Sequence, residues 1–365
     1  MAAALALLAA MGASLGAAPR AGDSKSAPPA KDAKTDTPGT DTKPPAGEDD
    51  AVVSLGVPPG FVLVGGAYLP QAAKGDAEWT EAFTLPPPKA DGSFDQNEIV
   101  ARQRKRAALL SKKLFAPFGL TETAHFLILS ETDAATTAAF AKWSEVLFAN
   151  LCAQFSLDRK ERVWRGKCCL MLFKTQTQFR NYARIFDGAS PSSGALAYFR
   201  WERMLPTTNP QLVHICMPIT DRGVGFNQMI FAHETTHAFL QMYRRPAPVP
   251  RWLHEGLAVY MTVVNDPSLR QEHWRQAQDW ARRGGTVDEM LEQGRGFFFA
   301  VFDYSVVYSV VDCLLKGGGG AKFKQFVCLL KDGKDQDTAL RTAYGFNTAG
   351  LASRWNIYMA TPGSK

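Results

Sequence analysis

The ten residues FAHETTHAFL, from Phe231 to Leu240, contain the pattern H-E-x-x-H, in which His233, Glu234 and His237 carry the chemistry. The apolar run predicts an α-helix, and helical residues four apart lie on one face, about one turn from each other. Two imidazoles in this arrangement can bind one tetrahedral metal ion, such as zinc. Glu234 is about 100° around the helix from His233, where it can hold a water and act as a general base.

A second segment, WLHEGLAVY at residues 252–260, follows a proline-rich break and supplies a candidate third ligand. Proline at a helix start and the apolar positions after it predict a helix over residues 251–264, with Glu255 in its first turn. A short connection folds this helix back beside the first, which brings Glu255 to the open side of the histidine pair. Two His and one Glu, with the fourth position left to water, form the ligand set of a catalytic zinc site. The alternative is that His233 and His237 are partly buried helix residues that bind no metal.

Together, these two segments resemble the gluzincin branch of the zinc metallopeptidases, in particular the peptidase MA-like family. The resemblance rests on HETTH, on WLHEGLAVY, and on the 18 positions (255 − 237) between His237 and Glu255. Metzincins are excluded because Leu240 and Tyr243 stand where their Gly and third His belong. The resemblance implies a zincin-like α+β fold, with a small mixed β-sheet packed on helices, two helices that form the zinc site, and a helical C-terminal part. It also implies Zn²⁺ as the cofactor and a peptide or protein as the substrate.

Three further residues bear on the predicted site. His254 stands where the resembling family often has Asn. Because a helical neighbour of Glu255 points elsewhere, we expect His254 to lie behind the metal ligands or at the surface. In gluzincins a Tyr or His commonly stabilises the oxyanion, so the resemblance implies this role for Tyr304 or Tyr308. The alternative is that both tyrosines are core aromatics on one helix face.

Predicted strands and helices alternate before the H-E-x-x-H helix. The strands are predicted at residues 125–130, 167–174, 194–201 and 212–217, and the helices at 134–155 and 176–186. This alternation implies neighbouring strands joined by crossovers, with the helices against one face of the sheet. His214 is interpreted as an ordinary strand residue that shares a face with Cys216, since two His and one Glu already complete the ligand set. The resemblance implies that the strand at 194–201 is the sheet edge beside the active-site cleft, where its backbone can pair with an extended peptide. The alternative is an ordinary interior strand.

Composition, together with the family resemblance, divides residues 1–362 of the chain into four parts. Residues 1–21 are an apolar run rich in Ala and Leu, which predicts a signal peptide and export to the periplasm or the cell exterior, or an anchor if it is not cleaved. Residues 22–51 are rich in Pro, Lys, Asp and Thr and predict a disordered linker. Residues 52–120 form a small extension with a hairpin around Gly65-Gly66 and a helix at 97–114. Residues 121–362 are the predicted catalytic domain.

Charge and cysteine content exclude other classes of site. The net charge of +6 is small for this length, and the basic clusters at residues 102–106 and 112–113 lie on a predicted helix, so nucleic acid is not an expected partner. After the first 21 residues, no stretch is long and apolar enough to predict a membrane span. The six cysteines include no C-x-x-C pair, which argues against a thiolate zinc cluster. They are either buried thiols or form one or two disulfides.

The sequence therefore predicts an exported zinc metallopeptidase. In this interpretation His233, His237 and Glu255 bind Zn²⁺, and Glu234 activates a water as the general base. Two other classes also fit: a non-catalytic zincin-fold protein that binds peptides or serves as a scaffold, and a zinc hydrolase that acts on a non-peptide substrate. The intact Glu234 argues against the first of these, because a binding module has no need of a base.

Overall fold

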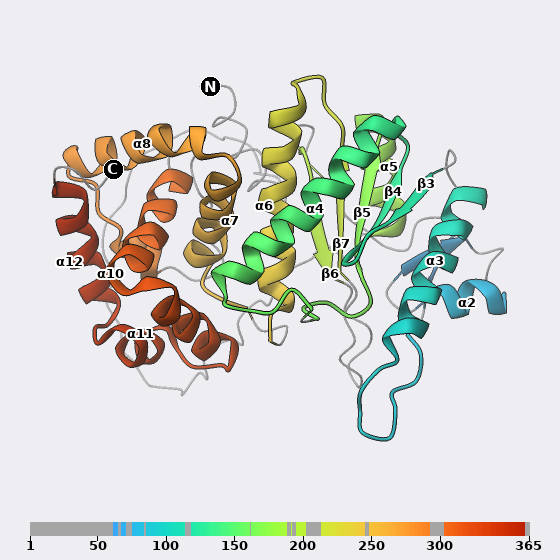
Figure 1. Ribbon diagram of the computed structural model, residues 1–365, viewed down its shortest axis with the longest axis horizontal. Helices are drawn as coiled ribbons and strands as arrows, with labels where there is room; N and C mark the ends of the chain where they lie inside the picture. Colours follow the sequence, from blue (N-terminus) through green and yellow to red (C-terminus); the bar gives the residue numbers. More distant parts are fainter. Residues whose placement is uncertain are drawn as a thin grey trace, which may run out of the picture.

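A five-stranded mixed sheet lies at the centre of the fold (Figure 1). Its strands, in spatial order, are β3 (Gly119–Glu122), β4 (Phe126–Ser130), β5 (Cys168–Phe173), β7 (Val213–Pro218) and β6 (Tyr198–Trp201). The three inner strands are parallel, and each edge strand runs antiparallel to its neighbour. Among the described strands, the predicted strand at 194–201 is thus the edge strand β6, shorter than expected, and does not lie in the interior of the sheet.

The computed structural model describes residues 61–64, 67–70, 75–83, 85–113, 118–160, 162–187, 191, 195–201, 213–244, 248–292 and 303–361. The predicted signal segment at residues 1–21 and the predicted linker at residues 22–51 lie outside these ranges. The proposed division of the chain into an extension and a catalytic domain stays a prediction.

The N-terminal extension contains the predicted hairpin, and the helix predicted at residues 97–114 is α3 (Gln96–Lys113). Strand β1 (Phe61–Val64) pairs antiparallel with β2 (Ala67–Pro70). Helix α2 (Ala77–Phe83) follows, and its Trp79 and Phe83 rings stack with centroids 5.4 Å apart in the core behind the sheet. These aromatic side chains attach the extension to the rest of the fold.

Two helices, α4 (Ala134–Gln154) and α6 (Val224–Met242), cover one face of the sheet. Side chains such as Ile128 of β4 point into this core. There Phe140 of α4 and Phe231 of α6 meet edge to face, with ring centroids 5.5 Å apart. Because α6 carries the H-E-x-x-H residues, this packing fixes them relative to the sheet.

The opposite face of the sheet is covered by α3 (Gln96–Lys113) and α5 (Gln176–Phe186), so the prediction that the helices lie against one face is wrong. Leu129 of β4 packs in this second core with Leu110 of α3 and Phe179 of α5. The physical reason is that the inner strands of the sheet, β4, β5 and β7, are mostly apolar and buried at successive positions. A strand that is buried on both faces needs helices on both sides of the sheet.

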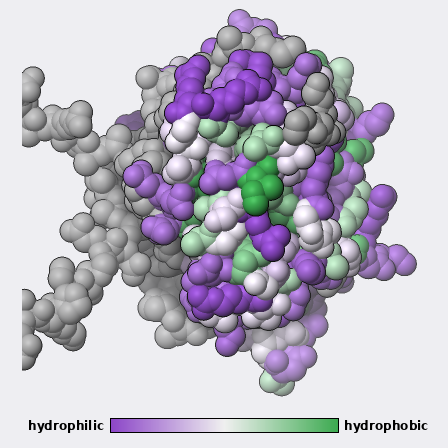
Figure 2. Space-filling view, turned by 90° about the vertical axis from the view of Figure 1, so that its left-hand side faces the viewer, coloured by the Kyte–Doolittle hydropathy of each residue, from purple (hydrophilic) through white to green (hydrophobic). Residues whose placement is uncertain are grey.

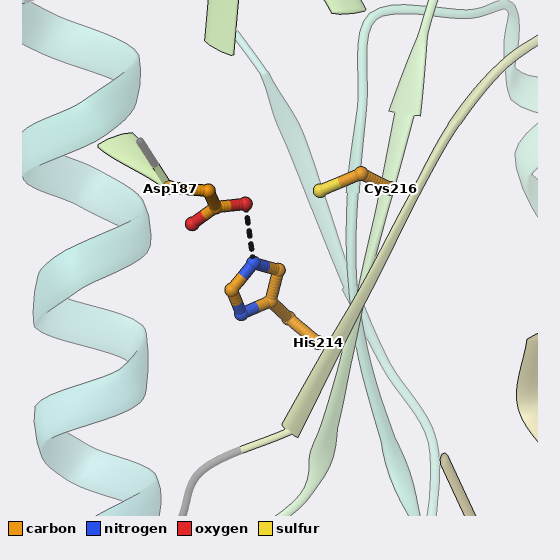
Figure 3. A group of neighbouring side chains, drawn as sticks. All are labelled: Asp187, His214 and Cys216. Carbon is orange, nitrogen blue, oxygen red and sulfur yellow. Dashed lines mark hydrogen bonds and ion pairs between the residues drawn. The ribbon is translucent and has the colours of Figure 1, made fainter. Parts of the chain in front are cut away.

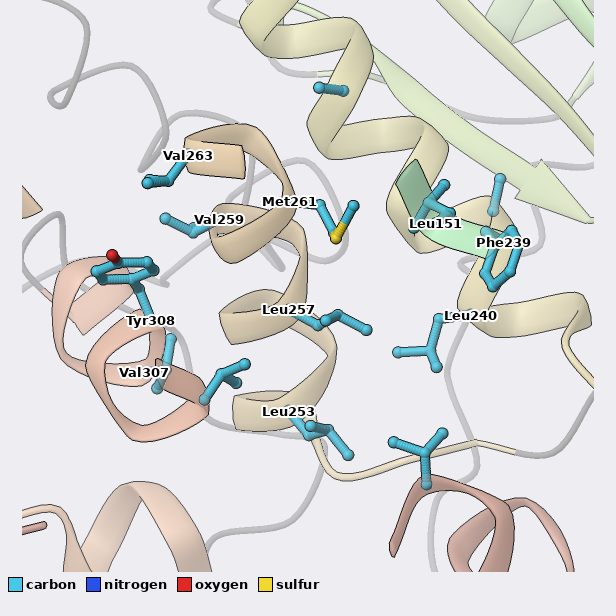
Figure 4. Close-up of a cluster of buried hydrophobic side chains, with 14 of the residues drawn as sticks. Leu151, Phe239, Leu240, Leu253, Leu257, Val259, Met261, Val263, Val307 and Tyr308 are labelled. Atoms are coloured by element: carbon cyan, nitrogen blue, oxygen red, sulfur yellow. The ribbon is translucent and has the colours of Figure 1, made fainter. Parts of the chain in front are cut away.

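Helix α7 (Arg251–Asn265) lies between α6 and α10 (Asp303–Lys331) and joins the sheet to the helical end of the molecule. Figure 4 shows Leu253 and Leu257 of α7 directed toward Leu240 of α6, with Val307 and Tyr308 of α10 on the other side of α7. This position brings the first turn of α7 close to the histidines of α6.

Gly256 allows α7 and α10 to approach closely, since a Cβ there would lie 2.5 Å from the Val307 carbonyl oxygen and 2.9 Å from Val311 Cγ2. Replacing Gly256 by Ala is expected to lower the free energy of unfolding by roughly 1–3 kcal/mol, because a packed interface resists an added methyl group. Urea unfolding measures this change. The matched control is Gly317→Ala in α10, where an added Cβ meets no atom within 4 Å. Equal effects of the two substitutions would contradict the close packing.

The C-terminal end is helical. Beyond α7 and the short 3₁₀ helix η3 (Pro267–Leu269), it comprises α8 (Arg270–Arg282), α9 (Asp288–Glu292), α10, α11 (Gln336–Tyr344) and α12 (Thr348–Ala360). The glycine run at 317–320 is predicted to end a helix, and Gly319 does interrupt α10 with φ 72° and ψ 171°. Figure 2 views this end and shows hydrophilic residues around scattered apolar ones, as is normal for a protein surface.

The small mixed sheet and the many helices make this an α+β fold with a helical C-terminal part. All six cysteines are free thiols in the structure, which contains no disulfide between them. Cys168 and Cys169 point to opposite faces of the sheet, as neighbouring residues on a strand do. Within the described ranges, no helix combines the length and the apolar character that crossing a membrane requires.

Candidate metal centre

The H-E-x-x-H residues lie in the middle of α6, between the sheet and the helical end (Figure 1). His233 is 1% exposed and His237 is 5% exposed. The C-terminal end of α6 is held by Lys331 of α10, whose buried ammonium donates to the carbonyl oxygens of Leu240 and Gln241, each at 2.8 Å. A positive charge at this end of a helix is favourable because the backbone dipoles place negative charge there. The histidines therefore sit on a helix that is fixed along its length.

His233, His237 and Glu255 form a buried triangle of potential ligand atoms. The two Nε2 atoms are 3.0 Å apart. Glu255 Oε2 lies 3.4 Å from His233 Nε2 and 3.3 Å from His237 Nε2. Ligand atoms about 2.1 Å from a tetrahedral zinc ion lie about 3.4 Å from one another, so these spacings fit one metal ion after a small widening between the histidines.

The electrostatics of this triangle favour a positive charge at its centre. Burial raises the pKa of Glu255, but His237 and His233 outweigh that effect and hold it well below its usual range. Glu255 in turn raises the pKa of His237 although burial opposes this. Within the described ranges, both histidine Nδ1 atoms are buried without a hydrogen-bond partner, so the Nε2 atoms carry the polar contacts. A divalent cation bound between the two Nε2 atoms and Glu255 Oε2 would supply the positive charge that this buried carboxylate favours.

Glu234 lies beside the triangle and does not belong to it. Burial raises the pKa of its carboxyl group, and the nearby His237 and His233 oppose this change. The backbone N–H of Phe199 in β6 also faces this carboxylate and lowers its pKa. A carboxyl group with a raised pKa accepts protons more readily near neutral pH, which is the property that a general base requires.

Strand β6 and His254 border the triangle on the sheet side. The Phe199 ring lies 5.5 Å from the His237 ring and 5.8 Å from the His254 ring. His254 stacks on His237 with ring centroids 4.2 Å apart and an angle of 9° between the planes. Burial, and then the neighbouring His237, hold the pKa of His254 well below its usual range, so this imidazole is neutral. His254 is thus partly buried and lies directly beside the candidate ligand His237.

The structure separates Tyr304 from Tyr308. The Tyr304 ring lies 6.3 Å from the His233 ring, and burial followed by Glu255 raises the pKa of its hydroxyl. Tyr308, one turn further along α10, instead stacks on Tyr260 with centroids 6.2 Å apart. The structure therefore brings Tyr304 to the triangle and directs Tyr308 away from it.

His273 of α8 is a buried histidine near the site that sequence reasoning missed, because no motif or spacing marks it. Gln276 Nε2 donates to Glu272 Oε1 at 2.8 Å, so Gln276 Oε1 accepts the proton of the Ser305 hydroxyl, also at 2.8 Å. The remaining bond, 2.9 Å between His273 Nδ1 and Ser305 Oγ, must then be donated by His273. This series of hydrogen bonds fixes the tautomer of His273, with the proton on Nδ1. Burial lowers its pKa to about 4, and His233 adds to the shift.

His273 predicts a loss of stability in mild acid. Its pKa is about 4 in the folded protein, against about 6.5 in an unfolded chain, so between these values only the unfolded chain binds the proton. The free energy of unfolding should fall by about 2 kcal/mol from pH 7 to pH 5 through this residue alone. Urea unfolding of the wild type and His273→Asn, both with a chelator present, measures the effect, since Asn keeps a donor for Ser305. Parallel pH profiles of the two proteins would contradict it.

Part of the chain matches a known protein family. Residues 184–361 match the family described as the Peptidase MA superfamily. This range includes α6, α7, β6 and α10, and so every residue of the site described above. No curated protein matches the chain.

Proposed function

Because residues 184–361 match the family described as the Peptidase MA superfamily, we propose that this protein is a zinc-dependent peptidase that hydrolyses peptide bonds. The observation that carries the proposal is the buried triangle of His233, His237 and Glu255, with the carboxyl group of Glu234 beside it. Two His and one Glu are the ligand set of catalytic zinc sites that keep one position open.

The proposed mechanism divides the chemistry between the metal and the protein. His233, His237 and Glu255 would hold a zinc ion, which would supply a Lewis acid that lowers the pKa of water to about 7 and polarises a carbonyl group. Glu234 then accepts the proton of the attacking water and passes it to the leaving amine. The general base and the metal ligands come from one rigid helix and the first turn of the next, so their separation is fixed before substrate binds.

The proposed substrate site is the edge of the sheet. Strand β6 has a strand neighbour on one side in the described sheet, and its residue Phe199 borders both Glu234 and His237. An extended peptide that pairs with such an edge is held by backbone hydrogen bonds, which depend little on its side chains. We therefore expect broad rather than narrow side-chain preference.

Tyr304 is the better of the two candidates for stabilising the oxyanion. Its ring is near His233, and its pKa is raised, so its hydroxyl keeps the proton that a hydrogen-bond donor needs. Tyr308 packs against Tyr260 and His273, with ring centroids 6.2 and 5.5 Å away, and we assign it to the core.

Metal removal tests the proposal. The purified protein should contain about one zinc ion per chain, and should cleave members of a peptide library until a chelator removes the metal. Added zinc should restore cleavage, and a chelator saturated with zinc beforehand is the control. A protein that binds zinc without cleaving any peptide would support the scaffold or the non-peptide hydrolase instead. A protein without zinc would contradict the whole assignment.

A further inference from the structure

Behind the sheet, on the face opposite to the metal centre, one buried carboxylate joins two strands. Asp187 follows the last turn of α5 and is 2% exposed. Its Oδ2 accepts a hydrogen bond from the Tyr198 hydroxyl at 2.7 Å and lies 2.8 Å from His214 Nε2. Figure 3 shows the Asp187 and His214 side chains directed toward each other, with Cys216 beside them.

The two partners of Asp187 belong to adjacent strands. Tyr198 is the first residue of the edge strand β6, and His214 is in its neighbour β7. In the antiparallel pairing, Tyr198 lies opposite Cys216, and Arg200 lies opposite His214. Hydrogen bonds to a buried charged group are stronger than those between neutral groups. A single oxygen therefore fixes the back of β6 to β7 and to the end of α5.

Strand β6 is short, and besides this bond it is held by its pairing with β7 and by its contacts with α6. It comprises four residues and pairs with one strand in the described sheet. Because side chains alternate along a strand, Tyr198 points to the back core and Phe199 points to the front, where its ring lies 5.5 Å from His237. The hydrogen bond from Tyr198 to Asp187 is therefore one residue away from Phe199, whose backbone borders Glu234.

We propose that Asp187 is a positioning residue, which acts through Tyr198 to hold the edge strand at the depth where Phe199 meets Glu234 and where the strand edge can receive substrate. The proposal rests on the peptidase function proposed above for its kinetic consequence only. Loss of the hydrogen bond between Tyr198 and Asp187 would let β6 shift within the sheet. Small displacements of groups that position a substrate slow catalysis strongly.

A metal ion is the competing explanation for this cluster. Asp187, His214 and Cys216 are all buried, and one ligand atom from each lies within 4.8 Å of the others. The hydrogen bonds favour the positioning role, since Oδ2 of Asp187 already serves both Tyr198 and His214. Burial also raises the pKa of the Cys216 thiol, which makes the thiolate that metals prefer less accessible.

The test compares Tyr198→Phe and Asp187→Asn with wild type, all loaded with zinc. Tyr198→Phe removes one hydroxyl and no volume of consequence from the core, so it should fold. Without substrate, amide hydrogen exchange in residues 195–201 should become about tenfold faster in both variants and stay unchanged in β4. With a peptide substrate, kcat/KM should fall about tenfold, with a clear rise in KM. Loss of active protein alone would lower kcat and leave KM as it was.

The matched control is Tyr344→Phe in α11, away from the sheet. It removes a buried hydroxyl that has no hydrogen-bond partner in the described part of the chain. It should change neither exchange in β6 nor KM. The double variant of Asp187→Asn and Tyr198→Phe should be no worse than Asp187→Asn alone, because both act through one bond.

Two results would overturn the proposal. One is unchanged exchange in β6 and unchanged KM in both variants. The other is a second metal ion in the wild type that is lost in Cys216→Ser, which would make the cluster a metal site. If the wild type cleaves no peptide while exchange in β6 still rises, the peptidase function fails and the structural link from Asp187 to β6 stands.

Discussion

A Glu234→Gln protein is expected to bind zinc as the wild type does and to cleave peptides about 10²–10⁴-fold more slowly, which is the usual contribution of a general base. Glutamine has nearly the size of glutamate and keeps an oxygen for the Phe199 N–H, but it cannot take a proton from water. Because Glu234 lies outside the triangle of His233, His237 and Glu255, the metal ligands stay in place. Zinc content by mass spectrometry and kcat on a cleaved peptide measure the two halves of this prediction.

The control for this variant is Glu289→Gln, which changes an exposed glutamate in α9 in the same way. It should leave kcat and zinc content unaltered. If Glu234→Gln retained its cleavage rate, Glu234 would not be the general base. If it lost its zinc as well, the effect on rate would say nothing about proton transfer.

Replacing Glu255 by Ala is expected to weaken zinc binding by more than the factor of about 10–100 that loss of a partner outside the ligand set causes. The change removes the carboxylate that lies 3.3 and 3.4 Å from the two histidine Nε2 atoms. It leaves His233 and His237 as the remaining ligands, and two ligands hold zinc poorly. Cleavage should fall together with zinc occupancy.

Competition with a coloured zinc chelator measures this loss, with Glu289→Ala as the matched control. Excess zinc should restore part of the zinc occupancy of Glu255→Ala. The recovered fraction of the cleavage rate should not exceed the recovered fraction of zinc-loaded protein. An affinity equal to that of the wild type would exclude Glu255 from the ligand set. The comparison with Glu234→Gln separates the two roles, because Glu255→Ala should impair zinc binding and Glu234→Gln should impair proton transfer.

Elements whose limits are set by neighbouring residues are well predicted from sequence. The helix predicted at residues 176–186 is α5 with the same bounds, and the helix predicted at 134–155 ends one residue earlier as α4. Each begins after a residue whose side chain accepts a hydrogen bond from the first turn, Thr175 for α5 and Asp133 for α4. Such caps are local, so the sequence alone shows them.

Features that depend on distant contacts are not predicted. The second layer of helices behind the sheet follows from strands buried on both faces, which short apolar runs do not distinguish from strands buried on one. Strand β3 was missed because it is four residues long and mostly exposed, without an apolar pattern. The contacts of Asp187 join a helix end to two strands, and no spacing along the chain marks them.

The candidate site divides in the same way. The distance between His233 and His237 follows from helical spacing, and the short connection between α6 and α7 made the approach of Glu255 an expectation that the geometry matches. Their role as metal ligands stays a prediction. Tyr304 and Tyr308 are one helical turn apart and equivalent in sequence, and only the crossing of α10 near His233 separates them.

The most direct test of the zinc peptidase assignment is a screen of one peptide library with the wild type and with Glu234→Gln, each carrying equal zinc, and with products read by mass spectrometry. The account predicts new peptide ends from the wild type, none above background from Glu234→Gln, and none from the wild type after zinc removal. Intact peptides from a zinc-loaded, folded wild type, or the same products from both proteins, would contradict it.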